Sequence, residues 1–287
     1  MLFDLWEETK PDLLVSVVPN FNRLLAQSLR LALPSVPFVT ILTDIADYPP
    51  HFWIEGESQY VICGSGRAVQ QAQALGLSAE RIFQTSGMIL NPRFYEVPQV
   101  DRIAEREKLG LAPAIATGMM LFGGYGASAM LDIVQRLDES EINLQLIAIC
   151  GKNQGLEQRL RGLRTKKPLH VEGFTKEIPY FMHLSDFFIG KPGPGSLSEA
   201  LAFKLPVIVQ RNAWTLPQER YNTEWVRENK VGIVVPSFRK TLPAVRELLE
   251  PANFAAYKAS AGRMRNTAIF EIPEILHGIL EKGTKGA

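Results

Sequence analysis

Short apolar runs alternate with longer amphipathic stretches along almost the whole chain. The apolar runs have the length and side chains of buried β-strands, and the stretches between them repeat apolar residues with the period of a helix. The predicted strands cover residues 13–18, 38–42, 60–63, 82–85, 119–122, 144–150, 169–173, 186–189, 206–210 and 232–235. The predicted helices cover residues 21–33, 66–75, 101–109, 129–137, 178–184, 197–203, 217–229, 242–249, 253–264 and 269–280. This alternation predicts βαβ units, mostly parallel sheets and therefore an α/β fold.

The alternation breaks once, between Asn91 and Thr117, where three prolines and a charged helix interrupt it. The break predicts a linker between two Rossmann-like domains that face a cleft. We place the amino-terminal domain and its linker at residues 1–110, the second domain at 111–268 and a carboxy-terminal helix at 269–287. The first domain is short for a doubly wound half, so we expect it to lack one or two βαβ units. Small ligands bind at the carboxyl ends of such strands and in clefts between such domains.

Composition narrows the class of protein. Hydrophobic residues make up 46% of the chain and charged residues 21%, which is typical of a globular protein. The net charge of +1 gives no support to nucleic-acid binding. Cys63 and Cys150 lie in strand-like runs, so we expect buried free thiols and a cytoplasmic location. The histidines lack metal-ligand spacing, no apolar run is long enough to span a bilayer, and the acidic start does not fit a signal peptide.

The strongest candidate site is a turn between a predicted strand and a predicted helix. Its residues are Lys191, Pro192, Gly193, Pro194, Gly195 and Ser196, with Glu199 one helical turn further on. The first backbone N–H groups of a helix have no intrahelical partner, and the helix dipole adds positive charge there. Such a helix start binds phosphate or diphosphate, and Glu199 would then lie near a ribose. Ser196 and Glu199 also have the spacing of a capping box, which is the structural alternative.

A second glycine-rich turn follows the strand predicted at residues 119–122. Its residues are Gly123, Gly124, Tyr125 and Gly126, and with Ala129 they fit the form of a dinucleotide fingerprint. That fingerprint requires an acidic residue after the next strand, and residues 149–153 contain none, so a nicotinamide or flavin cofactor is disfavoured. A P-loop is excluded because no Lys-Ser or Lys-Thr pair follows the glycines. A plain strand-to-helix turn remains the alternative.

A third candidate loop leads into the helix predicted at residues 217–229. Gln218, Glu219 and Asn222 are expected to project from its first turn, where an amide beside a carboxylate suits a ligand with several hydroxyls, such as a sugar. A solvated helix start is the alternative. The chain contains no Asp-x-Asp, the usual device that holds a metal ion against a nucleotide-sugar diphosphate. We therefore expect no metal and no cofactor, with Lys191 and backbone N–H groups stabilising a leaving diphosphate.

These motifs together resemble the monogalactosyldiacylglycerol synthase and diacylglycerol glucosyltransferase family. The similarity in the second half rests on residues 123–126, 149–153, 171–174, 191–200 and 217–219, in that order and spacing. In the first half it rests on residues 11–16, Thr43-Asp44 and residues 87–94. The resemblance implies a GT-B glycosyltransferase, related to the peptidoglycan lipid N-acetylglucosaminyltransferase.

The resemblance also implies a UDP-sugar donor and a lipid acceptor such as diacylglycerol. Phe174 and Thr175 would lie beside the uracil, and Glu199 would hold the ribose hydroxyls. Gly195 and Ser196 would bind the diphosphate, and Gln218 with Glu219 would hold the sugar hydroxyls. The family transfers its hexose with inversion, in one displacement, and a base in the first domain takes the proton from the acceptor hydroxyl.

The chain departs from the family pattern in its first domain. The family's Gly-Gly-Gly-His loop is missing, so two alternatives stay open: a truncated homologue that binds UDP-sugar or a partner without turnover, and an enzyme similar to UDP-N-acetylglucosamine epimerases. Asp44, at a strand end, is the base candidate, although it could be a plain loop aspartate. His51 and Trp53 follow it at roughly the places of a family His and Trp, and His51 is the second catalytic candidate. The segment 48–54 could be an interfacial loop on a membrane surface, or it could pack in the core.

Overall fold

A computed structural model of the protein describes residues 2–55 and 59–284, and the chain divides into two compact units. The first unit comprises residues 1–91, 217–221 and 265–287, and the second comprises residues 92–216 and 222–264. The predicted boundaries at 110 and 268 differ from this division. The charged helix after Asn91 packs with the second unit, and the last helix returns to the first.

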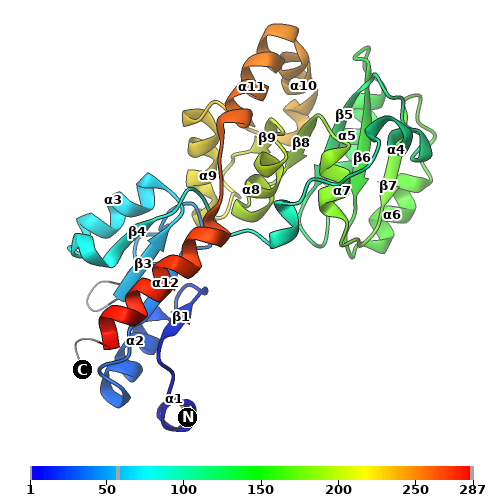
Figure 1. Ribbon diagram of the computed structural model, residues 1–287. Coiled ribbons are helices and arrows are strands. Elements are labelled where there is room, and N and C mark those ends of the chain that lie inside the picture. The colour runs from blue at the N-terminus through cyan, green and yellow to red at the C-terminus, as the bar shows by residue number, and fades with distance from the viewer. Residues whose placement is uncertain (1, 56–58, 285–287) are drawn as a thin grey trace. The chain divides into compact units, whose positions relative to one another are not determined.

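The first unit contains a four-stranded parallel sheet in the order β1-β2-β3-β4. Strands β1, β3 and β4 of this sheet are labelled in Figure 1. Its strands are β1 (Leu14–Ser16), β2 (Phe38–Ile41), β3 (Gln59–Cys63) and β4 (Ile82–Gln84). Its helices are α1 (Leu2–Thr9), α2 (Asn22–Ala32), α3 (Gly66–Ala74) and α12 (Ala268–Thr284), with a short 3-10 turn at Ala79–Arg81. Of these helices, α1 lies outside the sequence predictions.

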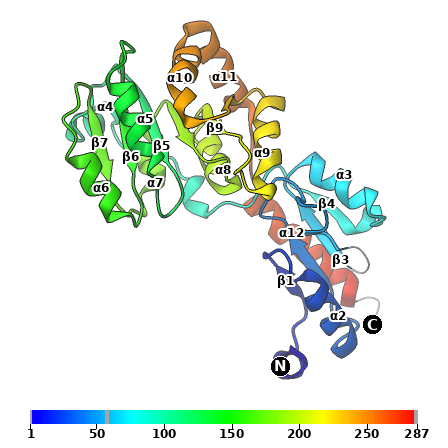
Figure 2. The same ribbon diagram turned by 180° about the vertical axis from the view of Figure 1, so that it is seen from behind.

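Both faces of this sheet are covered. Successive side chains of a strand point to opposite faces, so Ile62 packs with Ile272 and Ile279 of α12 on one side. Val61 and Cys63 pack on the other side, in a cluster that contains Ala68 of α3. Figure 2 shows α12 running along the strands. The sheet is therefore a buried layer between helices, as parallel sheets require.

The second unit contains a six-stranded parallel sheet in the order β10-β9-β8-β5-β6-β7. Its strands are β5 (Ala116–Leu121), β6 (Leu144–Ile149), β7 (Leu169–Glu172), β8 (Phe187–Gly190), β9 (Val207–Gln210) and β10 (Gly232–Val235). The chain runs outward from β5 to β7 and then restarts at β8 on the other side of β5. The strand order reverses between β5 and β8, and ligands of such folds bind at the carboxyl ends of the strands at that switch point.

Helices cover this sheet as well. They are α4 (Arg102–Lys108), α5 (Ala129–Asp138), α6 (Gln154–Arg161), α7 (Ile178–His183), α8 (Pro194–Ala202), α9 (Pro217–Glu228), α10 (Thr241–Leu249) and α11 (Pro251–Arg263), with 3-10 turns at Pro92–Phe94 and Phe238–Lys240. The first turn of α9 belongs to the first unit and the rest of it to the second. Every residue of β6 is buried, and Met120, Leu146 and Ile189 pack with residues of α5. The predicted α/β class with parallel sheets is confirmed.

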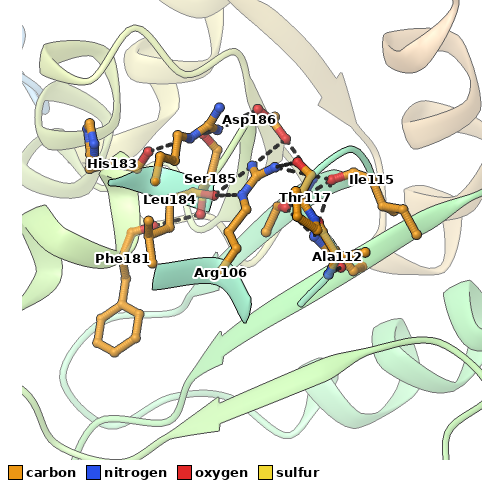
Figure 3. A network of polar contacts seen from close by, with 12 residues as sticks. Arg106, Ala112, Ile115, Thr117, Phe181, His183, Leu184, Ser185 and Asp186 are labelled. Carbon is orange, nitrogen blue, oxygen red and sulfur yellow. Dashed lines mark hydrogen bonds and ion pairs between the residues drawn. The ribbon is translucent and has the colours of Figure 1, made fainter. Parts of the chain in front are cut away.

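An arginine cluster fixes α4 to the amino-terminal edge of the six-stranded sheet (Figure 3). Arg106 is 3% exposed and donates hydrogen bonds to the carbonyls of Leu184 and Pro113 and to the Asp186 carboxylate, at 2.7–2.9 Å. Arg102 donates to the other carboxylate oxygen of Asp186 at 2.6 Å. Asp186 also accepts the backbone N–H of Thr117 at 2.8 Å, at the start of β5. These long-range bonds explain why the predicted linker helix belongs to the second unit.

The charge of Asp186 depends on this cluster. Burial by itself would raise the pKa of the carboxyl, but the hydrogen bonds from Arg102 and Thr117 and the charges of both arginines outweigh it. The pKa of Asp186 is therefore lowered, and the carboxylate stays ionised between its two partners.

Cys63 and Cys150 are both buried free thiols, as predicted. Burial raises the pKa of Cys63 to about 12 and that of Cys150 to about 11. Within residues 2–55 and 59–284, no helix has the length and apolar character needed to cross a membrane. The same residues contain no group of three or more histidine, cysteine or acidic side chains arranged to hold a metal ion.

Candidate functional site

The candidate donor site lies at the carboxyl-terminal edge of the six-stranded sheet. Because all six strands are parallel, the loops that follow them leave the sheet at the same edge. Two of these loops carry the predicted glycine turns, after β5 and after β8, on either side of the switch point. The fold thus brings residues 123–126 and 191–196 to the edge where such sheets bind ligands.

The start of α8 leaves backbone N–H groups available for a ligand. Gly193 is the N-cap residue and has no side chain with which to cap the helix, and Pro194 occupies the first turn. The first intrahelical bond runs from the N–H of Leu197 to the carbonyl of Gly193, at 3.1 Å. The N–H groups of Gly195 and Ser196 therefore lie at the positive end of the helix dipole without intrahelical partners. A Cβ atom at Gly195 would meet nothing within 4 Å, so a phosphate has room to approach there.

The capping box considered for Ser196 and Glu199 is wrong. The helix starts three residues earlier than the sequence predicted, so Ser196 lies inside the first turn, where its hydroxyl donates to the carbonyl of Gly193 at 3.3 Å. Proline at the first position permits this early start, because its fixed φ suits a helix and its missing N–H is not needed there.

Glu199 is half-buried one turn into α8, and no hydrogen bond to its carboxylate is found among the described residues. Burial raises the pKa of this carboxyl, and the charge of Arg93 partly offsets that effect. Arg93 lies in the 3-10 turn Pro92–Phe94 and donates to the carbonyl of Lys176 in the loop after β7. A half-buried carboxylate with free acceptor capacity is suited to bind hydroxyl groups. The sequence analysis missed Arg93 as a site residue, although it lies in a segment that carried the family resemblance.

The turn after β5 is held against the turn after β6. Gly123, Gly126 and Gly151 all have positive φ angles, between 58° and 76°, which L-residues with side chains rarely adopt. The N–H of Lys152 donates to the carbonyl of Gly124 at 2.8 Å, and a Cβ atom on Gly151 would lie 2.3 Å from that same oxygen. The space around Gly124 itself is open. Gly151 thus shapes the turn, and Gly124 can be approached by a ligand.

Two exposed aromatic rings and a lysine extend this edge of the sheet. Tyr125 is 72% exposed and Phe174 is 60% exposed. The Lys152 ammonium lies 5.9 Å from the ring centroid of Tyr125 and 5.5 Å from that of Phe174, so it contacts both π-faces. Thr175, predicted to lie beside the uracil, accepts the N–H of Glu177 at 2.9 Å and stabilises the turn before α7.

Asn222 occupies a different place from the one predicted. It is fully buried, and its side-chain amide donates to the carbonyl of Pro192 at 2.7 Å. The expectation that Asn222 projects from the helix start toward a sugar is therefore wrong, since it lies beneath the turn after β8. Gln218 and Glu219 are in the first turn of α9, and their contact with sugar hydroxyls stays a prediction. Lys191 is exposed.

The base candidate of the first unit is a buried carboxyl. Asp44 is 8% exposed, and its carboxylate accepts the indole N–H of Trp53 at 2.9 Å. Burial raises the pKa of Asp44, the hydrogen bond from Trp53 lowers it, and the nearby charge of Asp47 raises it further. The net shift is upward, so the pKa of Asp44 is raised and its carboxylate accepts a proton more readily than that of an exposed aspartate.

The segment 47–54, which follows Asp44, is held by hydrogen bonds to Asp47 and is buried at its end. The backbone N–H groups of Trp53 and His51 donate to Asp47 at 2.7 and 3.1 Å, and the His51 side chain is exposed. No hydrogen bond between the His51 imidazole and Asp44 is found in the part of the chain that the structure describes. Trp53 and Ile54 are almost completely buried, so the interfacial-loop interpretation of this segment is wrong for those two residues.

Comparison with solved structures defines the class of fold. MurG from Acinetobacter baumannii superposes with a TM-score of 0.65 at 12% sequence identity, covering 96% of this chain and 76% of that one. HepE from Anabaena in complex with UDP-glucose superposes with a TM-score of 0.60 at 17% identity, covering 96% and 81%. The parallel α/β units and these neighbours define a GT-B glycosyltransferase fold.

The chain belongs to glycosyltransferase family 28, because the model of that family's C-terminal domain matches residues 120–266. Monogalactosyldiacylglycerol synthase 1 from Arabidopsis thaliana is 28% identical over 285 residues, which cover 95% of this chain and 52% of that protein. The chain thus spans about half the length of the curated relatives that it matches. The family resemblance inferred from the sequence motifs is confirmed.

Proposed function

We propose that the protein binds a UDP-sugar at the carboxyl-terminal edge of its six-stranded sheet and transfers the hexose to a lipid acceptor such as diacylglycerol. The observation that carries this proposal is the helix start at Gly195 and Ser196, with free N–H groups, next to the Glu199 carboxylate one turn later, which accepts no hydrogen bond from the described residues. A nucleoside diphosphate offers the matching chemistry, a diphosphate next to a ribose with two hydroxyls.

The relatives support the choice of donor and acceptor. One structural neighbour was solved with UDP-glucose, and the relatives found by sequence are monogalactosyldiacylglycerol synthases. Their names point to a UDP-linked hexose and a diacylglycerol acceptor.

The proposed reaction is a single displacement at the anomeric carbon. The bond from that carbon to the phosphate oxygen breaks, the bond to the acceptor oxygen forms on the opposite face, and the acceptor proton passes to Asp44. The N–H groups of Gly195 and Ser196 stabilise the negative charge that develops on the leaving UDP. Lys191 adds a mobile positive charge at the same turn, and Glu199 holds the ribose so that the diphosphate reaches the helix start.

The donor site is tested by titrating UDP into Glu199→Ala. Hydrogen bonds to a charged group contribute about 1.5–3 kcal/mol, so we expect UDP affinity to fall by roughly 10- to 100-fold. Glu139→Ala, an exposed glutamate that follows α5, is the matched control and should bind UDP normally. Unchanged affinity in Glu199→Ala would remove the assigned site.

The reaction is tested by measuring UDP release from UDP-glucose and UDP-galactose, with and without diacylglycerol in detergent micelles. Release that requires diacylglycerol and is lost in Asp44→Asn supports the transferase. A parallel assay with UDP-N-acetylglucosamine tests the alternative, because release of UDP and of an epimerised free sugar without lipid would indicate epimerase-like chemistry. Binding of UDP without release from either sugar would leave a non-catalytic nucleotide-sugar-binding protein.

A further inference from the structure

The side chain of Asn222 uses only part of its hydrogen-bonding capacity. It lies in α9 and is fully buried, and its amide group donates to the Pro192 carbonyl at 2.7 Å. Its amide oxygen is one of two buried side-chain atoms without a hydrogen-bond partner among the described residues. A buried acceptor without a partner costs stability, and an apolar residue of the same shape would avoid that cost. The position of Asn222 is therefore not explained by fold stability alone.

The carbonyl that Asn222 holds belongs to the proposed diphosphate-binding turn. Pro192 and Pro194 lack N–H groups, so the turn has few donors with which to fix its own shape. In the described chain, no other hydrogen bond reaches Pro192–Gly195 from an element outside α8. The contact ties the turn to a residue on α9, one helical turn after Gln218.

We infer that Asn222 is a positioning residue for the diphosphate-binding turn, an inference that rests on the proposed function. By holding the Pro192 carbonyl, Asn222 fixes the path of the turn into α8, so that the N–H groups of Gly195 and Ser196 converge on the diphosphate. The residue itself does not touch the donor, because its side chain is enclosed beneath the turn.

The test compares UDP with uridine, which lacks the diphosphate, in Asn222→Leu. Leucine has nearly the same shape but cannot donate to Pro192. We expect UDP affinity to fall about tenfold and uridine affinity to change less than twofold, with a melting-temperature shift under about 4 °C. Asn229→Leu is the matched control, since Asn229 makes the same type of bond, to the Trp225 carbonyl at 2.8 Å, at the end of the same helix. It should change neither affinity.

The outcomes distinguish failure of the positioning role from failure of the proposed donor site. If UDP binds Asn222→Leu as tightly as the wild type, or if UDP and uridine affinities fall equally, the positioning role is overturned while the donor site stands. If the wild type binds neither UDP nor uridine, the proposed function fails and this inference fails with it. If Asn222→Leu does not fold, the UDP and uridine affinities of Asn222→Ser are compared instead.

A second variant tests the hydrogen bond itself. In Asn222→Asp the ionised carboxylate cannot donate to Pro192 and repels the diphosphate, so UDP affinity at pH 7.5 should fall more than in Asn222→Leu. When protonated, the same side chain has an O–H that can donate to Pro192. The ratio of wild-type to variant UDP affinity should therefore fall toward 1 as the pH is lowered. A ratio that does not change with pH contradicts the inference.

Discussion

The polar groups at the two edges of the six-stranded sheet differ in whether they have hydrogen-bond partners within the protein. At the amino-terminal edge, Arg106, Arg102 and Asp186 satisfy one another and the carbonyls around them. At the carboxyl-terminal edge, the described residues provide no hydrogen-bond partner for the first N–H groups of α8 or for the Glu199 carboxylate. Both edges belong to the same strands, so the difference does not come from the architecture of the sheet.

Polar residues at the first edge stabilise the fold, whereas those at the second edge are available to bind a ligand. Burying polar groups is favourable for folding only where they are paired. Groups left without partners cost stability, and they are kept where a ligand supplies the missing partner. Substitutions of the paired groups at the first edge should therefore lower stability without changing UDP binding. Substitutions of the unpaired groups at the second edge should weaken UDP binding without lowering stability.

The largest effect is expected for Arg106→Leu. This change removes one of the two arginine partners of the Asp186 carboxylate and the guanidinium donor of the Leu184 and Pro113 carbonyls. Breaking such a buried pair costs about 3–5 kcal/mol. Urea unfolding measures the loss, and UDP affinity of the folded variant should be close to that of the wild type. Arg161→Leu, which removes only the surface pair with Glu157, should cost less than about 1 kcal/mol. A cost for Arg106→Leu as small as that would contradict the comparison.

The next largest difference is expected between two glycines in neighbouring turns, Gly151 and Gly124. Gly151→Ala forces a side chain into a left-handed backbone and against the Gly124 carbonyl, so we expect a loss of about 2–4 kcal/mol in urea unfolding. Gly124→Ala meets open space and should change stability by less than about 0.5 kcal/mol. If the diphosphate approaches this turn, Gly124→Ala weakens UDP binding nonetheless. Equal stability losses in both variants would show that Gly124 is structural.

The pH dependence of stability should have opposite signs at the two edges. The pKa of Asp186 is lowered, so its stabilising contribution is present above its unfolded pKa, about 3.9, and is lost as the pH falls through its folded value. The pKa of Glu199 is raised, so its carboxylate destabilises the folded state at neutral pH, and protonation removes that penalty.

Asp186→Asn should therefore be less stable than the wild type at pH 7, and Glu199→Gln more stable and weaker in UDP binding. The Glu199→Gln difference should shrink first, as the pH falls through the raised pKa of Glu199 toward its unfolded value of about 4.3. The Asp186→Asn difference should shrink only below the unfolded value of about 3.9. Unfolding free energies measured from pH 3.5 to 7.5 provide the check. The prediction is wrong if the two variants shift stability in the same direction at pH 7.

The smallest effect is expected for Lys152→Met. The lysine contacts the exposed rings of Tyr125 and Phe174, and an exposed cation–π contact contributes about 0.5–1 kcal/mol. We expect UDP affinity to fall two- to fivefold because the ring of Phe174 is held less firmly. Arg81→Met removes a comparable contact with Tyr60 in the first unit and should leave UDP affinity unchanged. The same loss in both variants would exclude a local role for Lys152.

The sequence by itself determined the class of fold and the region of the candidate site. Every strand of the structure overlaps a predicted one, because a short apolar run between turns has few other ways to be buried. The turns at residues 123–126 and 191–196 were found because glycine and proline mark backbone shapes that depend on local conformation alone. Helices α1 and α6 were missed, since neither shows a long apolar period.

Tertiary structure decided which polar residues are paired. Asp186 and Arg106 are 80 residues apart in the chain, and Asn222 lies 30 residues from the carbonyl that it holds. The return of α12 to the first sheet, the burial of Trp53 and the effect of the Arg93 charge on Glu199 also depend on contacts between segments far apart in the chain. Residue type and spacing report local propensity, whereas the partner of a buried polar group is set by which segments the whole chain brings together.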